Sequence, residues 1–270
     1  MRKSPRSRRR HIVEAFSTIY WFHELSQQLN SESVAELQRT IEPLPKGTPE
    51  QLENLRRRWR DYCHGLHSPS EPVIALAEAR CPGSHQVLKS PFWDSLRHDK
   101  PAEKAALALM GETSLLGDDL LARMLVMKTQ GRGRGDDPRW LRKRCNAMVQ
   151  EASLEGLGVL TVCVRLAGDA GYERLAASLF WSVKRSLNIL GPGLYSNGIA
   201  RRLAEYYECV LLPDCGQYRN LVNFDSSSYL YTVSAVCRML QARAEAKNVE
   251  WLEHDEAIAE IFTVLGNSCD

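Results

Sequence analysis

The sequence has no apolar run long enough to cross a membrane. Its longest candidate is the stretch 157–164, which contains Gly and Thr, whereas a membrane helix needs about 20 predominantly apolar residues. The basic start of the chain is also not followed by the apolar stretch of a secretory signal. We therefore expect a cytoplasmic protein that has no membrane segment.

No Cys-x-x-Cys pair occurs among the eight cysteines. A disulfide framework is not expected in a cytoplasmic chain of this length. A zinc site stays open as an alternative, because Cys63, His67, Cys81 and His85 are suitable ligand types and their two pairs are spaced as in a zinc finger. Their order, however, is Cys–His followed by Cys–His. We therefore favour structural cysteines and no bound metal.

The motifs of common enzyme classes are missing as well. The sequence contains no Gly-x-Ser-x-Gly, no Walker loop, no His-Glu-x-x-His and no dinucleotide-binding Gly-x-Gly-x-x-Gly. The Gly-Arg repeat at 131–135 has glycines but neither a preceding strand nor the right spacing. We therefore expect no cofactor and no catalytic residues, and an enzyme is the least favoured class of function.

Period-2 alternation is nearly absent, whereas apolar residues recur with the 3.6-residue period of helices through most of the chain. The sequence therefore predicts an all-α fold, with Gly191–Gly193 as a helix break. We expect an N-terminal domain, 1–98, and a helical bundle, 99–270, because the composition becomes rich in Ala and Leu from Pro101 onward. Helices are predicted at about 12–29, 34–41, 49–64, 71–80, 102–110, 115–127, 138–152, 154–167, 171–190, 199–212, 227–246 and 249–265, with a short one after Ser90.

The clearest helix start is Thr48-Pro49-Glu50-Gln51, which has a capping residue, a proline at the first helical position and the glutamine of a capping box. Gly65 is well placed to end this helix. Its apolar positions form one stripe, which we expect to be buried against the helix that holds Tyr20 and Phe22. The stripe consists of Leu52, Leu55, Trp59 and Tyr62.

The segment Trp59-x-x-Tyr62-x-x-Gly65-x-x-x-Pro69-Ser70 resembles the later part of the helix-turn-helix in Xre-type, phage-repressor-like regulators. The resemblance implies an N-terminal helix-turn-helix-like unit, although the Pro43–Thr48 connection is longer than the usual turn. Residues 19–97 also resemble a group of bacterial proteins that brings no established activity. That likeness rests on Tyr20-Trp21-Phe22, Trp59 to Ser70, Pro82-Gly83-Ser84 and Pro91 to Leu96.

Clustered basic residues favour nucleic acid as the partner, because guanidinium groups suit phosphates and guanine edges. The net charge of +2 is uninformative. On the helix around Trp59, Arg56, Arg57 and Arg60 are expected to matter most, and Arg58 is expected in an internal ion pair. The candidate nucleic-acid-binding residues are Arg8, Arg9, Arg10, Arg56, Arg57, Arg58, Arg60, Arg142 and Lys143.

The leading hypothesis is a DNA-binding protein of bacterial regulation or of a mobile-element or defence locus, with duplex DNA as its partner. Two interpretations of the charged segments without a binding function stay open. Charge runs of this kind are commonly solvated helix faces, and the acidic stretch 245–270 is suited to neutralise a basic face. The alternative function is a helical interaction subunit, whose C-terminal bundle binds a protein partner without direct DNA contact.

Overall fold

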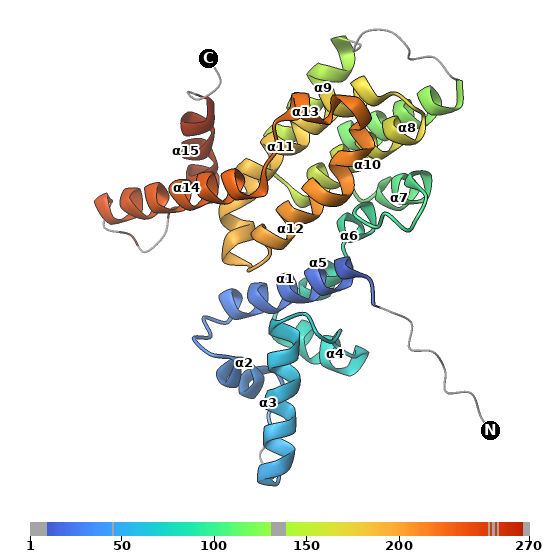
Figure 1. Ribbon diagram of the computed structural model, residues 1–270. Helices are drawn as coiled ribbons and strands as arrows, with labels where there is room; N and C mark the ends of the chain where they lie inside the picture. Colours follow the sequence, from blue (N-terminus) through green and yellow to red (C-terminus); the bar gives the residue numbers. More distant parts are fainter. Residues whose placement is uncertain are drawn as a thin grey trace, which may run out of the picture. The chain divides into compact units, whose positions relative to one another are not determined.

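The structure is a computed structural model that describes residues 10–44, 46–130, 139–247, 249, 252 and 254–266. All regular structure in these ranges is helical and no strand occurs there, so the all-α prediction is confirmed (Figure 1). Internal contacts divide the chain into two compact units, Met1–Trp93 and Asp94–Asp270. The sequence placed the corresponding boundary between residues 98 and 99. None of the described helices combines the length and the apolar character that crossing a membrane requires.

The first unit is a group of short helices around an aromatic core. α1 lies against α3 and α5, α2 packs on α3, and α4 packs on α5. α5 was not predicted, because only six residues separate the flanking turn signals. The helices are α1 (Ile12–Gln28), α2 (Val34–Ile41), α3 (Pro49–Cys63), α4 (Glu71–Arg80) and α5 (Ser84–Lys89), and α6 (Pro91–Ser95) spans the boundary between the units.

Both ends of α3 follow the predicted signals. The Thr48 hydroxyl accepts a hydrogen bond from the backbone N–H of Gln51 at 3.3 Å, and the Gln51 side chain accepts one from the Thr48 N–H at 2.9 Å. These bonds satisfy two of the N–H groups that a helix start leaves unpaired. After the helix, Gly65 adopts a φ of 67°, which favours glycine.

Three residues of the predicted stripe, Leu55, Trp59 and Tyr62, form the core of the first unit together with residues of α1, whereas Leu52 is only half-buried. Trp59 is fully buried, with its ring centroid 6.2 Å from that of Trp21 and 6.4 Å from that of Phe22. The expected burial of Trp59 against α1 is therefore confirmed. Tyr20, which lies on the same helix, contacts the ring of Trp93, with 5.7 Å between the two centroids.

The second unit is built around α10 (Leu154–Asp169), whose residues 156–167 are all buried. A helix that is apolar on every side belongs in the middle of a core, and α7, α8, α9 and α11 pack around it. The remaining α-helices of this unit are α7 (Ala102–Leu109), α8 (Leu115–Gln130), α9 (Arg139–Gln150), α11 (Glu173–Ser196), α12 (Ala200–Tyr206), α13 (Arg219–Val222), α14 (Ser226–Ala246) and α15 (His254–Gly266). Between α12 and α13 lie a π-helical segment, η1 (Tyr207–Leu211), and a 3₁₀ segment, η2 (Leu212–Tyr218).

The predicted break at Gly191–Gly193 is wrong, because α11 continues through Pro192 to Ser196. A proline inside a helix removes one hydrogen bond and crowds the preceding turn. Packing against α14 holds the helix together here: a Cβ on Gly191 would lie 2.5 Å from a methyl group of Val233. The close approach of two helices therefore outweighs the local preference of the sequence to stop.

Candidate nucleic-acid interface

Arg58 of α3 is half-exposed and is ion-paired within the first unit. Its guanidinium forms an ion pair of 2.5 Å with Glu42, which follows α2, and the indole N–H of Trp59 donates to the same carboxylate at 3.1 Å. Burial alone would lower the pKa of Arg58, but the hydrogen bond and charge of Glu42 raise it above its ordinary value. The predicted internal ion pair of Arg58 is confirmed.

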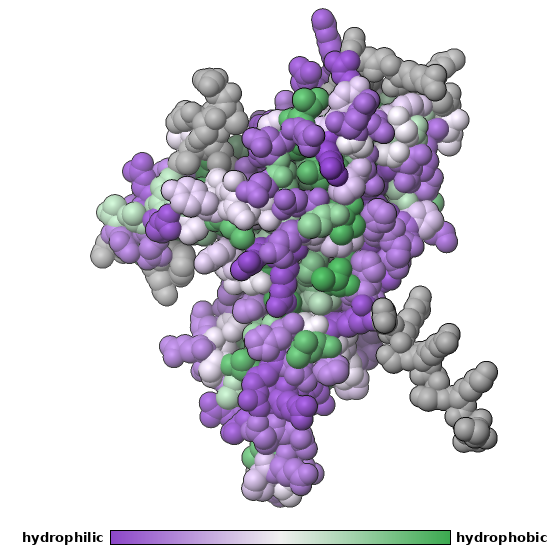
Figure 2. Space-filling model, viewed as in Figure 1, coloured by the Kyte–Doolittle hydropathy of each residue, from purple (hydrophilic) through white to green (hydrophobic). Residues whose placement is uncertain are grey.

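The other three arginines of α3 differ in whether they have an ion-pair partner. Arg60 forms an exposed ion pair with Glu53 of the same helix. Arg56 and Arg57 are exposed, and neither has an ion-pair partner among the residues that the structure describes. The visible surface of α3 is mainly hydrophilic (Figure 2). Two of the four predicted arginines are therefore uncompensated, because carboxylates of α3 itself and of the segment after α2 neutralise the others.

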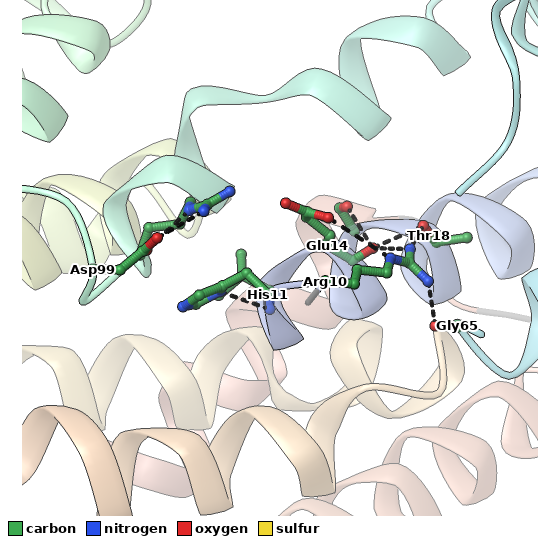
Figure 3. A network of polar contacts seen from close by, with 9 residues as sticks. Arg10, His11, Glu14, Thr18, Gly65 and Asp99 are labelled. Atoms are coloured by element: carbon green, nitrogen blue, oxygen red, sulfur yellow. Dashed lines mark hydrogen bonds and ion pairs between the residues drawn. The ribbon is translucent and has the colours of Figure 1, made fainter. Parts of the chain in front are cut away.

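Arg10 links the start of α1 to the end of α3 (Figure 3). Its guanidinium donates to the carbonyl oxygen of Gly65 at 2.5 Å, to that of Glu14 at 2.6 Å and to the hydroxyl of Thr18 at 2.7 Å. Burial lowers the pKa of Arg10, and the nearby charge of Glu14 opposes that shift. These three bonds use N–H donors of both terminal nitrogens of the guanidinium and tie Arg10 to the first unit. Arg8 and Arg9 lie outside the described residues.

A second group of cations lies on α9 in the other unit. Arg139, Arg142, Lys143 and Asn146 follow the i, i+3, i+4, i+7 spacing of one helix face, and all four are exposed. The opposite face is buried. α9 contains no acidic residue, and its three exposed cations form no ion pair within the described part of the chain. The predicted residues Arg142 and Lys143 therefore belong to an uncompensated cationic stripe.

α11 presents a matching polar stripe beside α9. Ser178, Trp181, Ser182 and Arg185 have the same i, i+3, i+4, i+7 spacing. The Arg185 guanidinium donates to the side-chain oxygen of Asn146 at 2.8 Å, which joins the two helices. This bond holds the charge of Arg185 next to the cationic stripe of α9.

Trp181 is an exposed aromatic side chain within this cationic surface. It retains 43% of its accessible surface, and the ammonium of Lys184 lies 4.7 Å from its ring centroid. Lys184 also donates to the backbone carbonyl oxygen of Asn223 at 3.1 Å. A large ring left partly exposed beside cations is the arrangement that proteins use for stacking nucleobases.

A small cavity lies between the two helices. Its volume is about 150 Å³, and none of its lining residues is acidic. An apolar cavity of about this volume is known to hold benzene, so the space is suited to one ring or one phosphate group. The lining residues are Leu141, Arg142, Cys145, Asn146, Ser178, Leu179, Trp181, Ser182 and Arg185.

Arg144 also lies on α9 but, unlike the three exposed cations of that helix, it has a carboxylate partner. It donates to Asp119 of α8 at 2.5 Å, and Arg123 donates to the same carboxylate at 2.9 Å. The hydrogen bonds from Arg123 and Arg144 lower the pKa of Asp119. Both guanidinium groups also approach the Trp140 ring, at 5.3 and 5.6 Å from its centroid. Charge on this side of α9 is therefore neutralised within the unit.

The four candidate zinc ligands do not come together. Among the described residues, no group of three or more His, Cys, Asp or Glu side chains is placed to hold a metal ion. Cys81 is buried in the core, where burial raises the pKa of its thiol. His67 instead lies 3.6 Å from the carboxylate of Asp61.

The basic clusters of the sequence did not point to Trp181. A helical projection of 173–196 would have placed Trp181 and Arg185 on one face, at i and i+4. The pairing of this face with α9 has no local signal, because the two helices are joined through α10 and their contact depends on the tertiary packing.

Comparisons with known proteins leave the chain without a family. No protein-family model, no curated protein and no solved structure matches it. The helix-turn-helix-like arrangement of the first unit, which was inferred from the segment Trp59–Ser70, therefore stays a prediction. α2 ends at Ile41 and α3 begins at Pro49, a wider separation than the turn of that motif.

Proposed function

We propose that this protein binds DNA through its phosphate backbone. The observation that carries the proposal is the surface of α9 and α11, where Arg139, Arg142, Lys143, Lys184 and Arg185 have no ion-pair partner in the described structure. Cations without internal partners are available to replace the counterions of a phosphate backbone. Backbone contacts of this kind position a protein on DNA and supply affinity, but they do not by themselves read sequence.

Arg56 and Arg57 of α3 form a second, smaller contact surface in this proposal. They are exposed and uncompensated, whereas Arg58 and Arg60 have carboxylate partners within the first unit. We therefore assign the DNA contacts of α3 to Arg56 and Arg57. Arg58 is assigned a structural role through Glu42, and Arg10 one through Gly65. A place in bacterial regulation or in a mobile-element or defence locus remains part of the proposal.

The test compares two variants that lose the same charge. Arg139→Ala/Arg142→Ala/Lys143→Ala removes the exposed cations of α9. Lys104→Ala/Arg201→Ala/Arg238→Ala, the control, removes exposed cations of α7, α12 and α14. Alanine is the best helix former, so both variants are expected to fold, as circular dichroism would show.

Fluorescence anisotropy with a labelled 20-base-pair duplex then measures the affinity. We expect the α9 variant to bind at least about tenfold more weakly than the wild type, since each lost phosphate contact reduces the electrostatic contribution to affinity. The control is expected to bind within about threefold of the wild type. Equal losses in the two variants would show that only net charge matters, and would contradict a defined interface on α9.

Arg56→Ala/Arg57→Ala tests the contact surface on α3. We expect a smaller loss of affinity than for the α9 variant, because two cations rather than three are removed. Arg58 and Arg60 are left in place, so the ion pairs with Glu42 and Glu53 persist. Unchanged duplex affinity in the folded variant would remove α3 from the proposed interface.

One observation favours the alternative function, a protein interaction subunit. The arginines of α3 do not form a continuous uncompensated face, since Arg58 and Arg60 are paired. A pull-down from native cells, performed with and without nuclease, separates the two functions. Partners that are lost on nuclease treatment support DNA binding. A protein partner that remains after nuclease, together with no affinity of the purified chain for duplex DNA, would support the interaction subunit instead.

A further inference from the structure

We propose that the cavity between α9 and α11 binds one phosphate group of an unpaired nucleotide, whose base contacts Trp181. This inference rests on the proposed DNA binding and makes it more specific: DNA with a single-stranded segment is the preferred ligand. It follows from three properties of the cavity, which are its size, its charge and the exposed ring at its wall.

The cavity is large enough for one chemical group of a ligand but too small for a complete nucleotide. Pockets that enclose complete small molecules typically measure about 300–1,000 Å³, whereas this one measures about 150 Å³. A complete nucleotide therefore does not fit inside, but a single phosphate group does. The rest of the strand then lies on the surface of α9 and α11.

The charge of the lining favours an anion. Arg142 and Arg185 both line the cavity, and no carboxylate does. The bond from Arg185 to Asn146 uses one of the five N–H donors of that guanidinium, so other donors stay available while its position is fixed. The remaining polar groups of the wall are the amide of Asn146 and the hydroxyls of Ser178 and Ser182. Guanidinium and hydroxyl groups are ordinary phosphate ligands.

The exposed ring favours an unpaired base. Trp181 lines the cavity and keeps 43% of its surface accessible, and Lys184 adds a cation 4.7 Å from its ring centroid. In a duplex, each base is stacked between its neighbours. A side chain on the protein surface therefore cannot stack on the face of a base. In a single strand the faces are accessible, and stacking on an aromatic side chain is tolerant of sequence.

The experiment compares a labelled single strand of thymidines with a duplex of the same length, using the full chain. We expect the wild type to bind the single strand more tightly than the duplex. Trp181→Ala should weaken single-strand binding roughly 5- to 150-fold, the range for losing one stacked base, and change duplex binding less than threefold. Trp181→Phe should retain most of the affinity. Tyr231→Ala, which removes another exposed ring, on α14, should have no effect.

A strand with abasic sites separates the phosphate from the base. Arg142→Ala/Arg185→Ala should weaken binding of both the abasic and the normal strand, whereas Trp181→Ala should weaken binding of the normal strand only. Circular dichroism establishes that each variant is folded, and Trp181→Leu, which also removes the aromatic ring but keeps an apolar side chain, serves if the alanine variant is not. A wild type that binds duplex but shows no loss with Trp181→Ala overturns this inference and leaves the proposed function standing. A wild type that binds no DNA overturns both.

Discussion

At the scale of single residues, Trp59 joins the apolar core to a buried polar contact. Its ring packs on Trp21 and Phe22, while its indole N–H donates to Glu42, which also holds Arg58. One side chain therefore fixes the position of α3 against both α1 and the end of α2. The sequence indicated the burial of Trp59 through its spacing, because Leu55, Trp59 and Tyr62 recur on one helix face. It did not indicate Glu42, which lies in a loop without periodicity.

Trp59→Ala should lower the free energy of unfolding by roughly 3–5 kcal/mol, since it empties a large site in the core. Trp59→Phe should cost less because most of the packing is kept. Urea unfolding followed by circular dichroism measures both changes. A loss below about 1 kcal/mol for Trp59→Ala would contradict the burial of this ring.

The cysteines should differ in their reactivity according to burial. Burial raises the pKa of Cys215 to about 12 and that of Cys163 well above its usual value, whereas Cys209 is exposed. The thiolate is the reactive form, so iodoacetamide near neutral pH should modify Cys209 before Cys163 and Cys215. Peptide mapping by mass spectrometry checks this order. Modification of Cys163 or Cys215 in the folded protein as fast as Cys209 would contradict the core packing around α10.

Asp214 should make stability depend on pH. Burial raises the pKa of its carboxyl, and the charges of His98 and Arg165 oppose that shift. A raised pKa in the folded state means that the stability from the protonated form is lost as the pH rises through that pKa. Asp214→Asn stays neutral, so its Tm relative to the wild type should increase as the pH rises above the ordinary pKa of an aspartate, which is about 4.

Thermal unfolding at several pH values measures this difference. A variant that is less stable than the wild type near neutral pH would show the reverse balance, in which the ion pair with His98, at 3.7 Å, outweighs the burial of Asp214.

At the scale of elements, the sequence predicted where a helix with a side-chain cap begins. It did not predict that α11 continues through a proline. The capping box at Thr48 placed the start of α3 correctly, because its hydrogen bonds are local. The continuation of α11 through Pro192 depends on contact with α14, which is distant in sequence. The candidate interface shows the same limit. Arg142 and Lys143 were named from the sequence, whereas the facing stripe with Trp181 required knowledge of which helices pack together.

The contact of α11 with α14 gives a prediction with an internal control. Gly191→Ala should destabilise the protein by about 1–3 kcal/mol, because the new Cβ would lie 2.5 Å from Val233. Gly193→Ala should instead raise stability by roughly 0.5–1 kcal/mol, since nothing lies within 4 Å of its Cβ position and alanine favours a helix.

Chemical denaturation compares the two variants, and Val233→Ala in the Gly191→Ala background should recover part of the loss. Equal stability of Gly191→Ala and Gly193→Ala would show that α14 does not restrict α11 at this point.

At the scale of the whole molecule, charge is divided between internal ion pairs and a few uncompensated cations. Many arginines bind carboxylates within their own unit, as Arg58 does with Glu42 and Arg144 with Asp119. Five cations of α9 and α11 have no such partner among the described residues, although the net charge of the chain is only +2: Arg139, Arg142, Lys143, Lys184 and Arg185. The net charge therefore gives no sign of this surface, which arises from the distribution of the carboxylates in the fold.

The salt dependence of duplex binding tests the proposed DNA binding most directly. For the wild type, the logarithm of the association constant should fall linearly with the logarithm of the salt concentration, by about 0.9 for each phosphate contacted. Arg139→Ala/Arg142→Ala/Lys143→Ala should reduce that slope by roughly 2 to 3, while the charge-matched Lys104→Ala/Arg201→Ala/Arg238→Ala variant keeps the slope of the wild type. A folded α9 variant with the affinity and slope of the wild type would contradict the claim that these cations bind DNA.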